Sequence, residues 1–142
     1  MTAKEFLSRA YKFDQRINSK LEQIAVLRSL TQKVTASFDQ EQVSHTRNVT
    51  SLQDTIIRLM EAEQQLDAEI DELVDLKTEI SSAICQLENM DYCILLEKRY
   101  LSFKTWEEIA VDMHYGIRWV QVMHGRALQA MDRLLAEGGV QG

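Results

Sequence analysis

The residues whose chemistry is most informative lie between positions 104 and 126. Arg118 and Gln121 carry the two side chains that pair best with base edges, because a guanidinium donates twice to guanine and a carboxamide exchanges two hydrogen bonds with adenine. The ring of Trp119 is suited to packing on a sugar or a thymine methyl group. Three further residues are expected to contact phosphates: Lys104, Thr105 and Arg126. Together these residue types predict noncovalent recognition of double-stranded DNA.

A helix-turn-helix is the arrangement that would place these residues on one surface. Thr105, followed by Glu108 three residues later, is a capping box and predicts a helix that begins at Thr105. A shorter helical segment is expected before it, near 92–101. Tyr115-Gly116 supplies a break after it, because glycine turns the chain at little steric cost. The last helix then has an apolar stripe formed by Val120, Met123, Ala127, Leu128, Met131, Leu134 and Leu135.

The opposite side of that last helix is polar and lacks carboxylates. At about 100° per residue, the positions that face away from the apolar stripe are Arg118, Val122, Gly125, Arg126, Gln129 and Arg133. No acidic residue occurs between Tyr115 and Met131, and a carboxylate in that stretch would repel a phosphate backbone. The pattern fits a DNA-reading helix, and it fits the solvated face of a small helical bundle equally well.

A longer segment, LLEKRYLSFKTWEEIAVDMHYGIRWVQVMHGRAL, resembles region 4 of sigma-70 factors, which reads the −35 promoter element. It is more similar still to the C-terminal part of small phage regulators of the RinA/ArpU type, which control late transcription in phages of Gram-positive bacteria. The resemblance is carried by Arg99, Tyr100, Thr105 to Ala110, Tyr115, Gly116, Arg118, Val120, His124, Ala127 and Leu128. The N-terminal segment KEFLSRAYKFDQRINSKLEQIAVLRSL also resembles the leading helix of that family.

This resemblance implies a sigma region 4-like helix-turn-helix, a phage or prophage late promoter as the target, and activation of transcription. The sequence departs from the family pattern near the start of the last helix. Gly116 stands where the family often has a capping serine, so we expect a weaker helix cap there. Trp119 and Val122 stand where polar or basic residues are frequent, so we expect fewer cations on the DNA-facing side.

Composition indicates an all-α protein. The 142 residues are 45% hydrophobic and 27% charged, with no proline and five glycines, whereas sheets need more turn residues. No apolar run approaches the roughly 18 residues of a membrane span, and the first residues lack the apolar core of a signal peptide. We therefore expect a cytoplasmic protein of a bacterial host with no membrane partner. Cys85 and Cys93 should be reduced; their spacing is not that of a zinc site, and neither a metal nor a cofactor is predicted.

Two long amphipathic helices are predicted before the helix-turn-helix, at about 3–34 and 49–88. In both, apolar residues alternate spacings of four and three, which is the repeat of a coiled coil. Residues 35–48 lose this pattern and are rich in Ser, Thr, Gln and Asn, which predicts the loop of an antiparallel hairpin. We therefore divide the chain into an oligomerisation region at 1–90, expected to form a homodimer, and a helix-turn-helix domain at 91–137.

Charge is distributed unevenly along the chain. Residues 1–60 contain nine Lys and Arg against six Asp and Glu, residues 61–90 contain one against nine, and the remainder contains six against seven. The acidic block belongs to the second long helix, where Glu63 and Lys77 also interrupt the apolar seam. Three interpretations of the block remain open. It is a solvated face, it pairs with the basic first helix within or between protomers, or it is a docking surface for a partner such as RNA polymerase.

The sequence favours a non-enzymatic function. It contains no glycine-rich phosphate loop, no nucleophile with a base at usable spacing and no catalytic carboxylate pair. The favoured function is a sequence-specific, double-stranded-DNA-binding regulator of phage or prophage late-gene transcription that acts as a homodimer. One alternative is a protein-interaction module that docks on RNA polymerase, which the acidic pI of about 5.1 favours. Another is a DNA-packaging protein of the small-terminase kind, which an assembly larger than a dimer would indicate.

Overall fold

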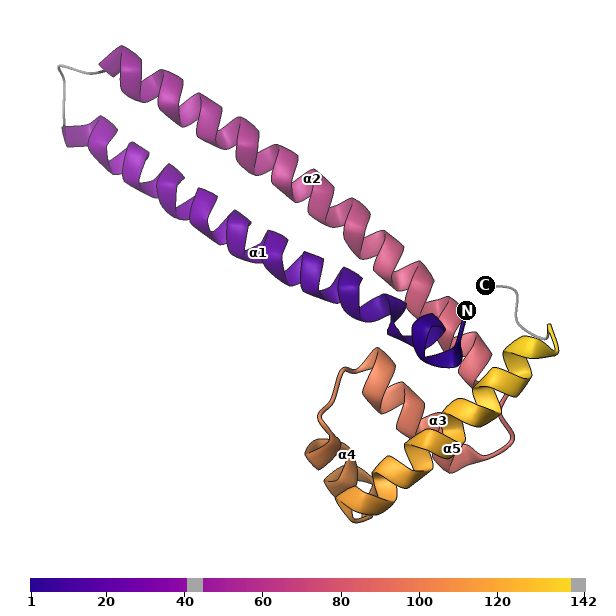
Figure 1. Cartoon of the computed structure of the whole chain (residues 1–142). Helices are drawn as coiled ribbons and strands as arrows, with labels where there is room; N and C mark the ends of the chain where they lie inside the picture. The colour runs from indigo at the N-terminus through magenta and orange to yellow at the C-terminus, as the bar shows by residue number, and fades with distance from the viewer. Residues whose placement is uncertain (41–44, 139–142) are drawn as a thin grey trace. The chain divides into compact units, whose positions relative to one another are not determined.

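The computed structural model describes residues 1–40 and 45–138, and gives no side-chain positions for residues 34, 37–40 and 45–48. As predicted, the protein is all-α, because the described residues form helices and no strand. The elements, labelled where there is room in Figure 1, are α1 (Ala3–Gln40), α2 (His45–Ile84), α3 (Met90–Leu96), the π-helical turn η1 (Glu97–Leu101), α4 (Trp106–Met113) and α5 (Ile117–Ala136).

The long helices α1 and α2 run antiparallel beside each other, as the heptad spacing predicts (Figure 1). The loop predicted at 35–48 is wrong for residues 35–40, which continue α1, and for residues 45–48, which begin α2; residues 41–44 lie outside the described residues. The hydroxyl of Thr31 donates to the carbonyl of Leu27 at 2.9 Å, and that of Thr35 donates to the carbonyl of Thr31 at 2.8 Å. Such bonds within a turn let a helix accommodate Thr, and no glycine or proline ends the segment.

The other end of α2 was also misplaced by the sequence pattern, since the helix ends at Ile84 rather than near residue 88. The thiol of Cys93 donates to the carbonyls of Ile84 at 3.3 Å and of Leu87 at 3.5 Å. These are the carbonyl of the last residue of α2 and that of a residue just beyond it, where the pattern of α-helical hydrogen bonds has ended. Asn89 then caps α3, because its side chain accepts the backbone N–H of Tyr92 at 3.2 Å. A thiol and a cap therefore decide where the chain changes direction.

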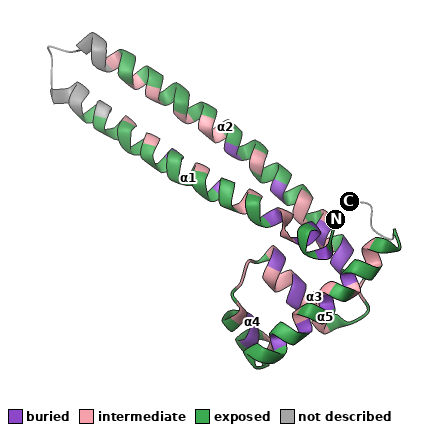
Figure 2. Ribbon diagram, viewed as in Figure 1, coloured by how far each residue is buried: buried purple, intermediate pink, exposed green. Residues whose placement is uncertain are grey.

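The chain divides into two compact units, Asp14–Glu72 and Met1–Phe13 with Leu73–Gly142. The first unit consists of hairpin residues alone, and the buried ones among its described side chains are Ile17, Ile24 and Leu66, all seam positions of the heptad pattern. Elsewhere in this unit the described side chains are half-buried or exposed (Figure 2). Burial of these three aliphatic side chains is the main source of stability for the pairing of α1 with α2 in this unit.

Three glutamates of the acidic block form ion pairs with arginines of α1 in the same chain. The pairs are Arg9–Glu79 at 3.1 Å, Arg16–Glu69 at 2.7 Å and Arg28–Glu63 at 3.0 Å. The basic first helix is thus a partner of the acidic second helix, which was one of the three interpretations. Partly exposed pairs of this kind contribute about 0–1 kcal/mol each, so they favour one register of the hairpin more than they stabilise it.

In the second unit, α3, α4 and α5 share a small core. It contains Leu95, Ile109, Ala110, Val120 and Met123, with Trp106 and Met113 packed against it. The start of α1 joins this unit through its backbone, since the N–H of Ala3 donates to Oδ1 of Asp132 on α5 at 2.7 Å. The predicted domain boundary at residue 90 therefore falls inside this compact unit, which also includes the first residues of α1, up to Phe13, and the last residues of α2, from Leu73.

Candidate nucleic-acid interface

The first helix of the predicted pair, α4, begins where its capping box requires. The backbone N–H of Glu108 donates to the hydroxyl of Thr105 at 3.2 Å, and the N–H of Thr105 donates to Oε1 of Glu108 at 3.2 Å. Two amides that the helix itself cannot satisfy are paired in this way. The sequence prediction of a helix start at this position is confirmed.

The turn between α4 and α5 spans 114–116, but glycine is not the residue that provides the unusual backbone. His114 adopts the left-handed conformation, with φ 59° and ψ 39°, and its N–H donates to the carbonyls of Ala110 and Val111. Gly116 has extended angles, φ −71° and ψ 152°, and gives α5 no side-chain cap. The expected weak cap is confirmed. The predicted break at Tyr115-Gly116 is confirmed, although the left-handed step of the turn is at His114 rather than at the glycine.

Tyr115 ties this turn to α3. Its hydroxyl donates to Oδ2 of Asp91 at 2.9 Å, and this hydrogen bond raises the pKa of the tyrosine above its usual value. The beginning of α5 is therefore positioned by a contact to another helix as well as by the turn itself.

The apolar stripe predicted for α5 is the side that faces the core. Val120, Met123, Ala127 and Met131 are at most 2% exposed, while Leu128, Leu134 and Leu135 are half-buried. The opposite side is exposed along its whole length, including Arg118, Trp119, Gln121, Val122, Gly125, Arg126, Gln129 and Arg133 (Figure 2). Four of the six predicted DNA-contacting residues thus lie on one solvent-facing surface of a single helix.

On that surface Arg126 and Trp119 are already in contact. The guanidinium carbon of Arg126 lies 5.2 Å from the centroid of the Trp119 ring, within the range of a cation–π interaction. Arg118 and Gln121 lie within the first two turns of α5, which begins at Ile117. The contact restricts where Arg126 can reach without removing its charge.

The remaining two predicted residues, Lys104 and Thr105, are engaged with carboxylates. Nζ of Lys104 donates to Oδ2 of Asp112 at 2.6 Å, and Nζ of Lys98 donates to the same oxygen at 3.3 Å. The hydrogen bonds of both lysines lower the pKa of Asp112, and the pKa of Lys104 is correspondingly raised. The hydroxyl of Thr105 is bound to the backbone and carboxylate of Glu108. The structure therefore brings Arg118, Trp119, Gln121 and Arg126 together and leaves this pair with acidic partners.

Asp112 is a residue that the sequence analysis missed. It stands eight positions after Lys104 and fourteen after Lys98, spacings that no local helical rule connects. The two lysines reach it only because α4 follows directly after the turn that closes η1. The acid holds two of the six Lys and Arg residues found after position 90, which reduces the cationic character of this unit.

Apolar side chains also surround the start of α5. Val111 is 73% exposed, and Ile117, Trp119 and Val122 are each 41–42% exposed. Such a group is unusual on a surface that binds only phosphates, whereas Trp and Arg among apolar neighbours are the residues that dominate many protein–protein contacts. The surface of α5 is therefore a mixed one, with arginines beside exposed apolar groups.

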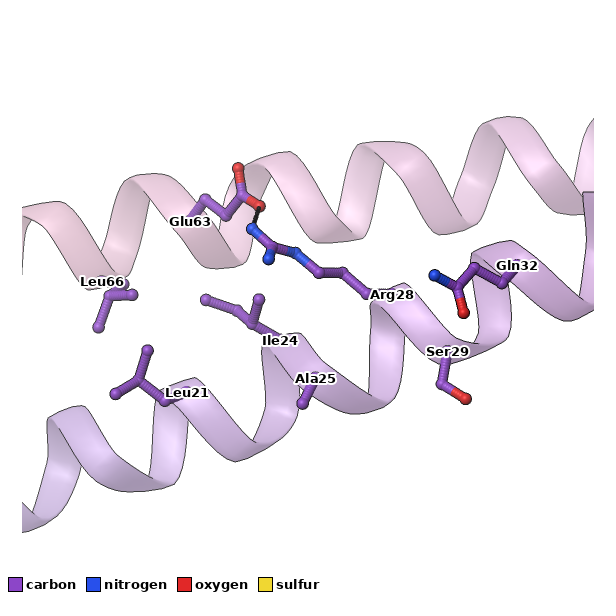
Figure 3. A pocket seen from close by; sticks show the side chains of 8 residues that line it. All are labelled: Leu21, Ile24, Ala25, Arg28, Ser29, Gln32, Glu63 and Leu66. Atoms are coloured by element: carbon purple, nitrogen blue, oxygen red, sulfur yellow. Dashed lines mark hydrogen bonds and ion pairs between the residues drawn. The ribbon is translucent and has the colours of Figure 1, made fainter.

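A groove lies on the hairpin unit, with a cavity volume of about 390 Å³. Figure 3 shows its lining residues: Leu21, Ile24, Ala25, Arg28, Ser29 and Gln32 on α1, and Glu63 and Leu66 on α2. The Arg28 side chain reaches from α1 to Glu63 on α2 at one part of the groove (Figure 3). Ala25 and Ser29 have small side chains, which leave room for the close approach of another helix.

Among residues 1–40 and 45–138, no helix is long and apolar enough to cross a membrane. The same part of the chain contains no group of three or more His, Cys, Asp and Glu side chains arranged to hold a metal ion. No family model, curated protein or solved structure matches the chain.

Proposed function

We propose that this chain is a sequence-specific, double-stranded-DNA-binding regulator of phage or prophage origin that acts on late-gene transcription. The observation that supports it most is the exposed side of α5. That side presents Arg118, Gln121, Arg126 and Arg133 to solvent, with no carboxylate between Tyr115 and Met131. A helix of this kind is suited to the major groove, where it meets phosphates at its edges and base edges at its centre.

In the proposed complex, α5 enters the major groove with its first two turns against the bases. Arg118 donates to a guanine and Gln121 bonds to an adenine, the pairings that their donor and acceptor geometry favours. Trp119 packs on a sugar or a thymine methyl group, and Arg126, beside its ring, reaches a phosphate. Lys104 and Thr105 have a secondary part at most, because both are bonded to carboxylates in the free protein.

The hairpin supplies the second half of the proposal, a homodimer. On α2, Ile56, Met60, Glu63, Asp67 and Ile70 recur at spacings of four and three and so share one side of the helix. Ile56, Met60 and Ile70 are 37–56% exposed, and Glu63 of this stripe also lines the groove on the hairpin. Two-fold pairing with a second copy would cover these apolar groups.

Charge complementarity favours a second copy as the occupant of this surface. Within the hairpin unit the α1 portion contains four Lys and Arg against three Asp and Glu, whereas the α2 portion contains two against seven. A two-fold dimer in which the more basic α1 of one protomer packs against the acidic α2 of the other would be complementary in charge in both halves of the interface. A dimer of this kind would present two α5 helices to paired half-sites.

The deciding experiment is the capture of DNA from a phage or prophage genome of the host. The purified protein is mixed with sheared genomic DNA, and bound fragments are sequenced at low and at near-physiological salt. One duplex site upstream of late genes, retained at the higher salt, would support the proposal. Weak and uniform recovery that disappears with salt would show electrostatic binding alone and would contradict sequence-specific recognition.

A second candidate function is a docking module for RNA polymerase. The observation that favours it is the apolar group around the start of α5, formed by Val111, Ile117, Trp119 and Val122. Direct binding of purified host RNA polymerase, measured with the wild-type protein and with Val111→Ser, tests this function. Val111 lies on α4, outside the residues proposed to read bases, so loss of polymerase binding with unchanged DNA binding would support docking. Unchanged binding of polymerase by the variant would remove the support of this surface.

A further inference from the structure

A cavity of about 510 Å³ lies within the unit that contains α3 to α5 and the start of α1. Its volume falls within the range of small-molecule sites. The lining residues come from four parts of the chain: Lys4, Ser8 and Tyr11 of α1, Arg99, Tyr100 and Phe103 of η1 and the turn after it, Trp106 of α4, and His124 of α5. None of them is among the residues proposed to contact DNA, so the inference does not rest on that function.

An irregular stretch of backbone brings three of these side chains to the cavity. The N–H of Ser102 donates to the carbonyl of Glu97 at 3.0 Å, and the N–H of Lys104 donates to that of Lys98 at 3.0 Å, so the turn is wider than an α-helix. Phe103 follows with φ 55°, in the left-handed region that a bulky residue rarely adopts. Wide helical turns and left-handed aromatic residues are found preferentially at binding sites.

The walls of the cavity are mostly aromatic, and several of the rings are held in place. Phe103 is in edge contact with Tyr11, with 5.8 Å between the two ring centroids. Nζ of Lys77 lies 4.9 Å from the centroid of the Phe103 ring. Trp106 meets the ring of His124 at 4.7 Å. A planar guest would find ring faces and edges already positioned, which lowers the conformational cost of binding it.

The charges at the cavity are all positive. Lys4 and Arg99 are its cations, and no Asp or Glu is among its lining residues. The guanidinium of Arg99 is fixed, because its carbon lies 4.2 Å from the centroid of Trp106 and its Nη1 donates to the carbonyl of Lys104 at 3.0 Å. A guanidinium has five N–H donors in total, so this fixed group retains capacity for an anionic guest.

The state of His124 shows that this positive field reaches the interior of the site. Burial lowers the pKa of His124, and the charges of Arg99 and Lys4 lower it further, to about 4. The ring is therefore neutral at pH 7, and its Nε2 is hydrogen-bonded to the hydroxyl of Tyr100 at 2.6 Å. Burial disfavours either sign of charge, so only the part of this shift that comes from Arg99 and Lys4 favours an anion.

We propose that this cavity binds a small molecule that combines a planar aromatic or heteroaromatic ring with a carboxylate or phosphate group. The ring lies among Tyr11, Phe103 and Trp106, and the anionic group is paired with Arg99 and Lys4. The guest touches α1, the turn after η1, α4 and α5 at once, so its binding stabilises the packing of all four.

Tryptophan fluorescence provides a direct test, because the chain has two tryptophans and one of them lines the cavity. In a Trp119→Phe background, Trp106 is the sole reporter. Adenosine 5′-monophosphate and nicotinate are titrated as the phosphate and carboxylate probes, with adenosine and nicotinamide as their neutral counterparts, because none of the four fluoresces as tryptophan does. We expect saturable quenching by one of the anionic probes and about tenfold weaker binding of its neutral counterpart, which corresponds to the loss of one charge-assisted interaction.

Variants then locate the binding site. Lys4→Gln and Arg99→Gln should each weaken binding of the anionic probe several-fold. Lys12→Gln is the matched control, since it removes the same charge from the same helix outside the cavity. Arg99 also packs on Trp106, so the result for Lys4→Gln decides the matter if the Arg99 variant loses its helical content.

A second readout comes from the histidine. A bound anion offsets the field of Arg99 and Lys4, so the pKa of His124 measured by NMR should rise when the effective probe is added. Equal binding of charged and neutral probes, an effect of Lys12→Gln as large as that of Lys4→Gln, or no saturable response to either anionic probe would overturn the proposal.

Discussion

Nζ of Lys104 donates to Oδ2 of Asp112 at 2.6 Å. The same oxygen accepts Nζ of Lys98 at 3.3 Å, so one carboxylate on α4 holds two lysines beside the helix that we propose reads DNA. This arrangement gives the unit fewer available cations than its sequence suggests, and it makes the carboxylate a competitor of phosphate.

Asp112→Asn should therefore strengthen DNA binding. Removal of the carboxylate leaves Lys98 and Lys104 without their acidic partner, so we expect several-fold higher affinity for DNA. The plot of log K against the logarithm of the salt concentration should also become steeper, by about the amount of one phosphate contact. Fluorescence anisotropy at several salt concentrations measures both quantities. The control is Glu107→Gln, which removes an exposed acid of the same helix that accepts no lysine. An equal gain in the control would mean that only net charge matters.

Arg118→Ala should relax sequence preference. If this guanidinium reads a base edge, its loss costs about 1–3 kcal/mol at the preferred site and little on unrelated DNA. Arg126→Ala is the comparison, because this guanidinium is proposed to reach a phosphate and a phosphate contact is lost equally from all sequences. Parallel titrations with specific and scrambled duplexes separate the two cases. A uniform loss for Arg118→Ala would contradict its base-reading role.

Thr105→Ala should destabilise the unit that contains α4. The substitution removes the hydroxyl that accepts the N–H of Glu108, and loss of an N-cap costs about 0.5–2 kcal/mol. Thr105→Ser retains the hydroxyl and should remain close to wild type. Urea unfolding followed by circular dichroism gives the free energy of unfolding for each. A loss of stability with serine as large as that with alanine would show that the methyl group, rather than the cap, is important.

Acid should destabilise the protein partly through His124. Its pKa is about 4 in the folded chain and about 6.5 when unfolded, so the unfolded state binds the proton more readily. The contribution to stability is complete above pH 6.5 and is lost as the pH falls from there towards 4. With allowance for its partial exposure, we expect the contribution of His124 to the free energy of unfolding to be about 2 kcal/mol. Urea unfolding of wild type and His124→Asn at several pH values isolates this part, since carboxylates titrate in both proteins. Parallel curves would contradict the assignment.

The exposed stripe on α2, which includes Met60 and Ile70, should control the oligomeric state. Met60→Gln with Ile70→Gln removes exposed apolar groups from one side of α2, so we expect a dimeric wild type and a more monomeric double variant with unchanged helical content. Val26→Gln is the matched control, since Val26 is 59% exposed on α1 and belongs to neither the seam nor the stripe. Sedimentation velocity provides the measurement. A monomeric wild type, or a double variant that remains dimeric, would exclude this interface.

The sequence by itself determined the elements whose cause is local or periodic. The heptad repeat predicts two long helices, the Thr105–Glu108 pair predicts the start of α4, and the 3.6-residue period of α5 predicts which side is buried. These features depend on residues within a few turns of one another, so composition and spacing are sufficient to find them. The exposure of Arg118, Trp119, Gln121 and Arg126 follows from the same period.

Only the tertiary structure decided the features that join residues far apart in the chain. The polar character of residues 35–48 suggested a loop, yet residues 35–40 continue α1 and residues 45–48 begin α2, and the hydroxyl of Thr35 is bonded to the carbonyl of Thr31 within its own helix. Asp112 captures Lys98 and Lys104, the thiol of Cys93 caps the end of α2, and Phe103 enters the left-handed region beside Tyr11. None of these has a signal at fixed spacing, because each is set by packing among segments that meet only in the folded protein.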